Sequence, residues 1–216
     1  YLEGRDYRGA AELMHKYLKT ESRRRHPRAL VGMGEAMLSL GYIDRALAAL
    51  NECIEFYPRD AAAFRARLLA SYAYMEKNQP EQAELLLQDN ISGDFLTPAS
   101  REWRESLFAL GQLLHTIGDY SRAIERLEEA VARYPDNPQA LKARYLAADS
   151  YRQFARSSRE QLQQNVVETA RATHGKQIRK AYLAALELCE EIQEQLSQRQ
   201  ETRELTAEHK LMLRNS

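Results

Sequence analysis

Apolar residues recur every three or four positions along most of this sequence, and the clearest stripe lies in residues 120–134. Its members are Tyr120, Ala123, Ile124, Leu127, Ala130, Val131 and Tyr134. This spacing matches the roughly 3.6-residue period of an α-helix and predicts amphipathic helices that bury one face. Pro58 and Pro135 each follow such a stripe, and each is expected to end a helix because proline lacks a backbone N–H.

Two segments share one spacing of apolar residues, glycine and proline. The first is Leu30-x-x-Met33-Gly34-x-x-Met37-x-x-x-Gly41-Tyr42-Ile43-x-x-Ala46-x-x-x-Leu50-x-x-Cys53-x-x-x-x-Pro58. The second is Leu107-x-x-Leu110-Gly111-x-x-Leu114-x-x-x-Gly118-Asp119-Tyr120-x-x-Ala123-x-x-x-Leu127-x-x-Ala130-x-x-x-x-Pro135. We expect Gly34 and Gly111 to let two helices approach closely because they carry no side chain. Gly41 and Gly118 are expected to form the turns between those helices.

The shared spacing resembles the pattern of the tetratricopeptide-repeat family, with Leu30 and Leu107 at the position usually held by tryptophan. Weaker copies occur elsewhere, and the matching alanines are Ala10, Ala46, Ala83, Ala123 and Ala185. Their intervals are 36, 37, 40 and 62 residues, and the first three are near the family's roughly 34. The resemblance implies an all-α fold, a right-handed superhelical solenoid of antiparallel helix pairs.

The resemblance also implies that residues 1–216 form a single array. We expect repeats at 27–58 and 98–135, a degenerate repeat at 60–90, and a repeat with a helical insert at 138–198. Residues 1–20 are interpreted as the second helix of a truncated repeat, and residues 200–216 as the first helix of another. The chain is therefore expected to be an internal fragment of a larger tetratricopeptide-repeat protein.

The insert is predicted at about residues 157–175. Two capping-box patterns, Ser157-x-x-Glu160 and Ser158-x-x-Gln161, predict that a new helix begins near Ser157. Gly175 is expected to end that helix, since glycine is common just past a helix C-terminus.

Charge and composition argue against several other classes of protein. Lys and Arg total 31, as do Asp and Glu, so the zero net charge provides no long-range attraction to nucleic acid or to an anionic membrane. No apolar run approaches the roughly 20 residues that span a bilayer, so we expect a soluble segment without membrane insertion. Cys53 and Cys189 lie in apolar helical stripes and are expected to be reduced thiols.

The sequence lacks the usual patterns of catalytic and metal sites. No two histidines have the close helical spacing of a zinc site, and no phosphate-binding loop, nucleophile elbow or dinucleotide-binding turn occurs. We therefore expect no enzyme activity, no cofactor and no metal. The basic run Arg23-Arg24-Arg25 is interpreted as helix-end cations, with contact to phosphate or an acidic partner as the alternative.

In the tetratricopeptide family the first helix of each pair lines a concave groove, and the resemblance carries this role to specific positions. In the first part of the chain these are Arg28, Val31, Glu35, Leu38, Arg65, Leu68, Tyr72 and Met75. Further along they are Glu105, Phe108, Gln112, His115, Lys142, Tyr145, Asp149 and Arg152. Glu35 and Asp149 would repel a carboxylate, which disfavours recognition of an acidic C-terminal tail. For Tyr72 and Tyr145, the alternative is that they only pack between neighbouring first helices.

The leading hypothesis is a non-catalytic scaffold of bacterial type that binds a peptide or helix of a partner protein in the groove. A structural alternative is a self-assembling or spacer module, a homo-oligomer that stacks through exposed repeat ends. The end residues are Tyr7, Met14 and Tyr17 on one side and Leu205, Leu211 and Leu213 on the other. A third hypothesis is a regulatory sensor domain of a larger multidomain protein.

Overall fold

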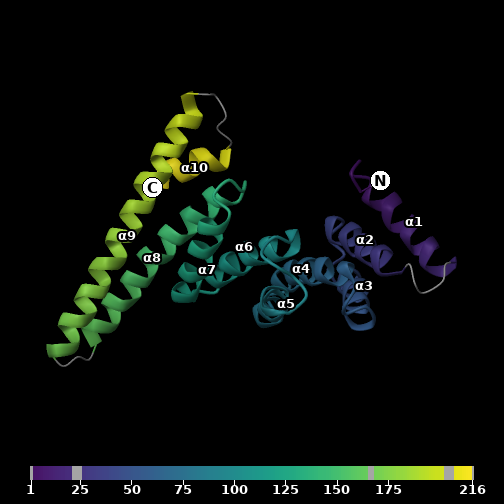
Figure 1. Cartoon of the computed structure of the whole chain (residues 1–216), viewed down its shortest axis with the longest axis horizontal. Coiled ribbons are helices and arrows are strands. Elements are labelled where there is room, and N and C mark those ends of the chain that lie inside the picture. The colour runs from purple at the N-terminus through teal and green to yellow at the C-terminus, as the bar shows by residue number, and fades with distance from the viewer. Residues whose placement is uncertain (1, 21–25, 165–167, 202–206, 216) are drawn as a thin grey trace. The chain divides into compact units, whose positions relative to one another are not determined.

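The computed structural model describes residues 2–20, 26–164, 168–201 and 207–215. Within these residues the chain forms ten α-helices and no strand, which confirms the all-α prediction (Figure 1). The helices are α1 (Tyr7–Thr20), α2 (His26–Ser39), α3 (Ile43–Phe56), α4 (Ala61–Glu76), α5 (Pro80–Ser92), α6 (Arg101–Thr116), α7 (Tyr120–Arg133), α8 (Ala140–Gln164), α9 (Glu168–Glu201) and α10 (Ala207–Asn215). The residues group into two compact units, 1–109 and 110–216.

In the first unit, helices that follow one another along the chain pack together. α1 packs on α2, α2 on both α3 and α4, α3 on α4, and α4 on α5. The core of α2, α3 and α4 includes Leu30, Leu47, Leu50 and Leu69, all of them buried. Removing these apolar stripes from water is the main contribution that holds the helices together.

Gly34 lies at the contact between α2 and α3. A Cβ at this position would lie 2.5 Å from Cγ of Leu50, whose side chain is fully buried. Gly111 of α6 faces Leu127 of α7 in the same way, because a Cβ there would lie 2.7 Å from Cδ2 of Leu127. The predicted close helix contacts are confirmed at both glycines.

Three turns between paired helices share one hydrogen-bond pattern. After α2, the Gly41 N–H donates to the Leu38 carbonyl and the Tyr42 N–H to the Met37 carbonyl, both at 2.9 Å. The same pair of bonds follows α4 and α6. Gly41 and Gly118 have φ of +78° and +84°, which confirms the predicted turns. In the remaining turn Asn78 takes this left-handed role with φ of 55°, which asparagine tolerates better than most residues.

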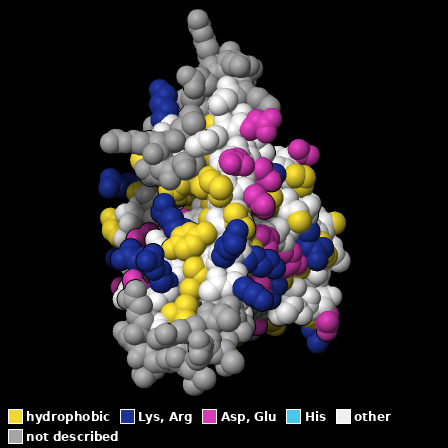
Figure 2. Space-filling model, turned by 90° about the vertical axis from the view of Figure 1, so that its left-hand side faces the viewer, with side chains coloured by type: hydrophobic (Ala, Val, Ile, Leu, Met, Phe, Trp, Pro, Cys, Tyr) yellow, Lys and Arg dark blue, Asp and Glu magenta, His cyan; other side chains and the backbone are white. Residues whose placement is uncertain are grey.

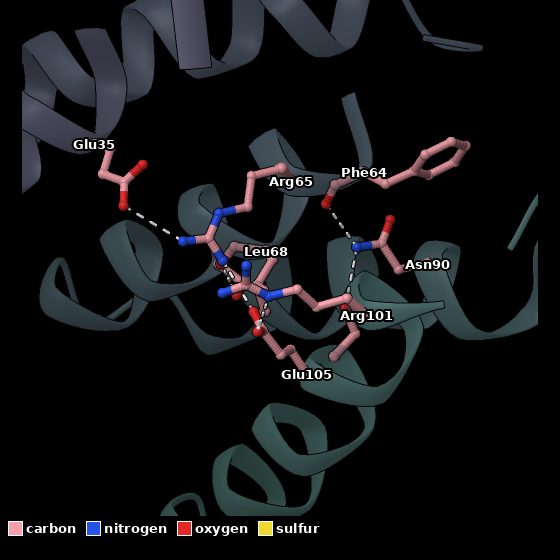
Figure 3. Close-up of polar contacts among 9 residues, drawn as sticks. Glu35, Phe64, Arg65, Leu68, Asn90, Arg101 and Glu105 are labelled. Atoms are coloured by element: carbon pink, nitrogen blue, oxygen red, sulfur yellow. Dashed lines mark hydrogen bonds and ion pairs between the residues drawn. The ribbon is translucent and has the colours of Figure 1, made fainter. Parts of the chain in front are cut away.

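Asn90 is a buried polar residue that connects three helices of the first unit. Its Nδ2 in α5 donates to the Phe64 carbonyl of α4 at 2.9 Å and to Oγ of Ser106 in α6 at 3.0 Å (Figure 3). Only 1% of Asn90 is exposed, so loss of these bonds would leave buried polar groups without partners. Asn90 therefore specifies how α4, α5 and α6 meet.

In the second unit, α7 packs on α8, α8 packs along α9, and α10 packs on α9. Leu141, Ile192, Leu196 and Met212 form a buried cluster that draws on all three of the last helices. Tyr145 is partly buried against this cluster.

The α8 and α9 helices correct the prediction for residues 157–175. α8 continues through Ser157 for 25 residues, and α9 passes through Gly175 over 34 residues. The predicted helix break near Ser157 and the stop at Gly175 are both wrong, and residues 165–167, which connect the two helices in the chain, lie outside the described residues. A glycine inside a helix costs only about 1 kcal/mol, and the packing of α9 on α8 outweighs this local signal.

Candidate partner-binding surface

Three of the predicted groove residues lie in the core. Val31, Leu68 and Phe108 are 8%, 0% and 3% exposed, respectively. For example, α2 packs both on its partner helix α3 and on the next first helix α4, so part of its apolar stripe is covered from both sides. The prediction that these three side chains line an open surface is therefore wrong. Leu38 and Met75 are half-buried.

In the first unit, ion pairs join the first helices α2, α4 and α6 (Figure 3). Nη2 of Arg65 in α4 lies 3.4 Å from Oε1 of Glu35 in α2, and Nη1 lies 2.9 Å from Oε2 of Glu105 in α6. The other oxygen of Glu105 accepts from Nε of Arg101 at 2.6 Å. We call Glu35, Arg65, Glu105 and Arg101 the charge ladder. It brings three predicted groove positions together, and Arg101 extends it.

The sequence analysis missed Arg101, although its four-residue spacing from Glu105 was a usable signal. Side chains four apart lie on one face of a helix and readily form an ion pair. The ion pair between Arg65 and Glu105 had no such signal in the sequence, because it depends on how α4 and α6 pack together.

Tyr72 is the exposed aromatic residue beside the charge ladder. It is 45% exposed, although it belongs to the first helix of its pair. Partial burial and the nearby Glu105 carboxylate raise the pKa of the Tyr72 hydroxyl, and Arg65 acts in the opposite direction. Tyr72 therefore remains a neutral hydrogen-bond donor at physiological pH, with one side of its ring open to solvent.

In the second unit, His115 of α6 contacts two side chains of α8. Its Nδ1 lies 2.9 Å from Oγ of Ser150, and its Nε2 lies 3.6 Å from Oδ2 of Asp149. Ser150 already donates its hydroxyl proton to the Leu146 carbonyl at 2.7 Å. It must therefore accept from His115, which places the proton of neutral His115 on Nδ1. Burial lowers the pKa of His115, and Asp149 opposes this shift.

Other predicted residues of the second unit converge on a small cleft between α8 and α9. It has a volume of about 40 Å³ and is lined by Tyr145, Ala148, Asp149, Arg152, Ala185 and Cys189. Asp149 forms an ion pair with Arg152, which is otherwise exposed. Gln112 is exposed, and Nζ of Lys142 lies 3.7 Å from Oε1 of Glu208. The structure thus groups Tyr145, Asp149 and Arg152 around one cleft.

A larger cavity lies between α1 and α2 in the first unit. Its volume is about 790 Å³, and its lining includes Met14, Tyr17 and Arg28. Met14 and Tyr17, predicted as part of a stacking end, are half-buried, and Tyr7 packs against a buried cluster of alanines. Leu211 of α10 is exposed. The arginine run at 23–25, Leu205 and the side chain of Leu213 lie outside the described residues.

Within the described residues, no cluster is suited to metal binding and the two cysteine thiols are protonated. They contain no group of three or more His, Cys, Asp or Glu side chains that could hold a metal ion. Burial raises the pKa of Cys53 to about 11, and it also raises that of Cys189, so both thiols stay protonated and weakly nucleophilic at neutral pH. No helix in the described part of the chain is long and apolar enough to cross a membrane.

Two sequence profiles of the tetratricopeptide repeat match the chain, over residues 28–60 and 104–155. These two segments are tetratricopeptide repeats. Both matches include a helix pair that carries the close-contact glycine and the left-handed turn glycine described above. No match was found among curated proteins.

Solved structures of other tetratricopeptide-repeat proteins have a similar fold. A crystal structure of MamA protein has a TM-score of 0.59 at 18% identity, covering 86% of this chain and 84% of that chain. Another MamA structure has a TM-score of 0.58 at 18% identity, with coverage of 86% and 90%. A protein from Podosopora anserina with nearly identical TPR-like repeats has a TM-score of 0.59 at 16% identity, covering 84% and 89%. These similarities confirm the solenoid class of fold.

Proposed function

We propose that this tetratricopeptide-repeat protein is a non-catalytic scaffold that binds a peptide or helix of another protein along the face lined by its first helices. The observation that carries the proposal is the contact between predicted groove residues of consecutive first helices. In the first unit this contact is the charge ladder, and in the second it is the pairing of His115 with Asp149. Such contacts produce an extended surface, which repeat proteins generally use to bind other proteins.

Exposed side chains beside these contacts supply the binding groups. Tyr72 borders the charge ladder in the first unit, and Arg152 is the most exposed of the cleft residues named above in the second. An aromatic ring on a solvent-accessible face gives a large contact area at a small entropic cost, since only two torsions must be fixed.

Each unit also pairs a tyrosine with a carboxylate. Tyr72 lies near Glu105, and Tyr145 lines the same cleft as Asp149. A tyrosine ring attracts a cation at its face, and the nearby carboxylate, although already paired with an arginine of this chain, can accept a further hydrogen bond from that cation. The arrangement therefore favours partner segments that carry Lys or Arg over acidic tails.

A peptide-display selection against the whole chain tests this proposal. We expect the selected peptides to be enriched in Lys or Arg and to lose about tenfold in affinity when Tyr72 is replaced by Ala. The matched control is Leu85→Ala, because Leu85 is 60% exposed on the second helix α5 of the same unit. Tyr72 and Leu85 are both exposed, so the circular dichroism spectrum and the melting temperature should stay unchanged in both alanine variants.

The outcome that contradicts the proposal is equally specific. If the selected peptides bind Tyr72→Ala and Tyr145→Ala variants as tightly as the unmodified chain, the face of the first helices is not the binding surface. Sensitivity to Leu85→Ala instead would place binding on the second helices.

A further inference from the structure

The long helix α9 has two faces of different character. One face is buried against neighbouring helices through Ala181, Ala185, Ile192 and Leu196. The opposite face carries Leu183 and Leu186, which are 50% and 55% exposed. Leu183 and Leu186 therefore form an apolar pair that the packing of this unit leaves exposed.

Charged residues on this outer face are separated by sign along the helix. Lys176, Arg179 and Lys180 precede Leu183, and all three are exposed. Glu187, Glu190 and Glu194 follow it, and these are exposed as well. Every one of these positions lies three, four, seven or eleven residues from Leu183, which places all of them on the same side of the helix.

Figure 2 shows the molecule from the side on which α9 lies in Figure 1. Hydrophobic side chains run down the middle of this face, Lys and Arg lie beside them in the lower half, and Asp and Glu gather mainly above and to the right. We call the eight residues from Lys176 to Glu194 named above the α9 strip.

Among the described residues, no ion pair compensates the charges of the α9 strip. Lys176 and Lys180 are four residues apart, as are Glu190 and its like-charged neighbour Glu194, and like charges at this spacing repel. None of the six charged side chains forms an ion pair with another described residue. A second surface whose basic and acidic residues follow in the opposite order would place unlike charges opposite each other and relieve this repulsion.

We propose that the α9 strip binds the α9 strip of a second copy of this chain, with the two helices antiparallel. A two-fold axis near residues 184–185 would place Leu183 of one copy against Leu186 of the other. The basic segment of each copy would then face the acidic segment of the other, with Lys176 opposite Glu194. A parallel arrangement would put like charges opposite each other, so the order of charges selects the antiparallel one.

The contact is small, which determines how the association should behave. One helix face buries less than the roughly 1,200 Å² of a stable interface, so we expect a reversible dimer. Its attraction is largely between exposed charges, so it should weaken as salt screens them.

Analytical ultracentrifugation of the whole chain over a concentration series tests the proposal. We expect a monomer–dimer equilibrium whose dissociation constant rises about tenfold between roughly 50 mM and roughly 500 mM salt. The variant Lys176→Glu/Arg179→Glu/Lys180→Glu should be monomeric, as should Glu187→Lys/Glu190→Lys/Glu194→Lys. An equimolar mixture of the two variants should form a heterodimer. All six positions are exposed, and unchanged circular dichroism verifies the fold.

Cysteine cross-linking determines the orientation, in a Cys189→Ser background. Lys176→Cys chains mixed with Glu194→Cys chains should form a disulfide-linked dimer, whereas Lys176→Cys chains alone should not. A chain that stays monomeric at low salt and high concentration would overturn the proposal. Self-association that the charge reversals do not change would overturn it too, and would favour stacking of the repeat ends. Efficient cross-linking of Lys176→Cys to itself would contradict the antiparallel order.

Discussion

The α2–α3 and α6–α7 pairs differ from the α8–α9 pair in how their helices are held together. In the first two, a glycine sits at the helix contact and another at the turn, so each helix has 14 or 16 residues and the turn is tight. In the α8–α9 pair, the helices have 25 and 34 residues, and no described atom other than the backbone of its own helix turn lies within 4 Å of the place that a Cβ of Gly175 would take. The comparison shows that a glycine is informative only together with its surroundings, since the same residue specifies packing in one pair and is incidental in the other.

The largest expected effect comes from adding a methyl group at the two kinds of glycine. Gly34→Ala should lower the free energy of unfolding by about 1–3 kcal/mol, because its Cβ would overlap the buried Leu50 side chain. Gly175→Ala should raise it by about 0.5–1 kcal/mol, since alanine is the better helix former and meets no neighbour. Urea titration of both variants measures whether each substitution lowers or raises the free energy of unfolding. A gain in stability for Gly34→Ala would show that α2 and α3 are not in close contact there.

The next effect concerns the turns. Gly118 has φ of +84°, so Gly118→Ala should cost about 1–2 kcal/mol, the strain of a side chain in the left-handed region. Asn78 has the same role with φ of 55°, and Asn78→Gly should be neutral or stabilising by a few tenths of a kcal/mol. Thermal unfolding of the two variants compares the turns directly. Destabilisation by Asn78→Gly would mean that the Asn78 side chain contributes more than its backbone conformation.

The smallest effect concerns His115, which links α6 to α8. Its pKa is lower in the folded chain than its ordinary value, because burial disfavours the charged ring. The unfolded chain therefore binds more protons near and below pH 6.5, and stability is lost as the pH falls through this range toward the folded pKa. The groups around the ring are Asp149 and Ser150 of α8 and Tyr120 of α7, with Arg152 paired to Asp149.

Replacing His115 by Gln should remove that part of the acid sensitivity. Between about pH 7.5 and about pH 5.5, we expect the melting temperature of the unmodified chain to fall by up to roughly 2–4 °C more than that of the variant. Differential scanning calorimetry at the two pH values measures this difference. An equal fall in both proteins would show that the Asp149 carboxylate compensates for the burial of the ring.

The local sequence determined the fold class and the short helix pairs. The apolar period of about 3.6 residues, the glycines at 34, 41, 111 and 118, and the prolines at 58 and 135 are all signals that act within one or two turns of helix. These glycines could be interpreted from the sequence because they recur at the same spacing from apolar residues in two segments.

Only the tertiary structure decided which of those positions are open and how far α8 and α9 extend. Leu68 and Phe108 are buried in the core whereas Tyr72 is exposed, although the resemblance implied a groove-lining role for all three, because exposure depends on which neighbouring helix covers each position. The capping-box patterns at Ser157 and Ser158 were overruled for the same reason: a local hydrogen bond of about 1 kcal/mol cannot break a helix that packs along its whole length against another. The outer face of α9 illustrates both cases. The sequence gives its charged residues, but only the tertiary structure shows that they are exposed.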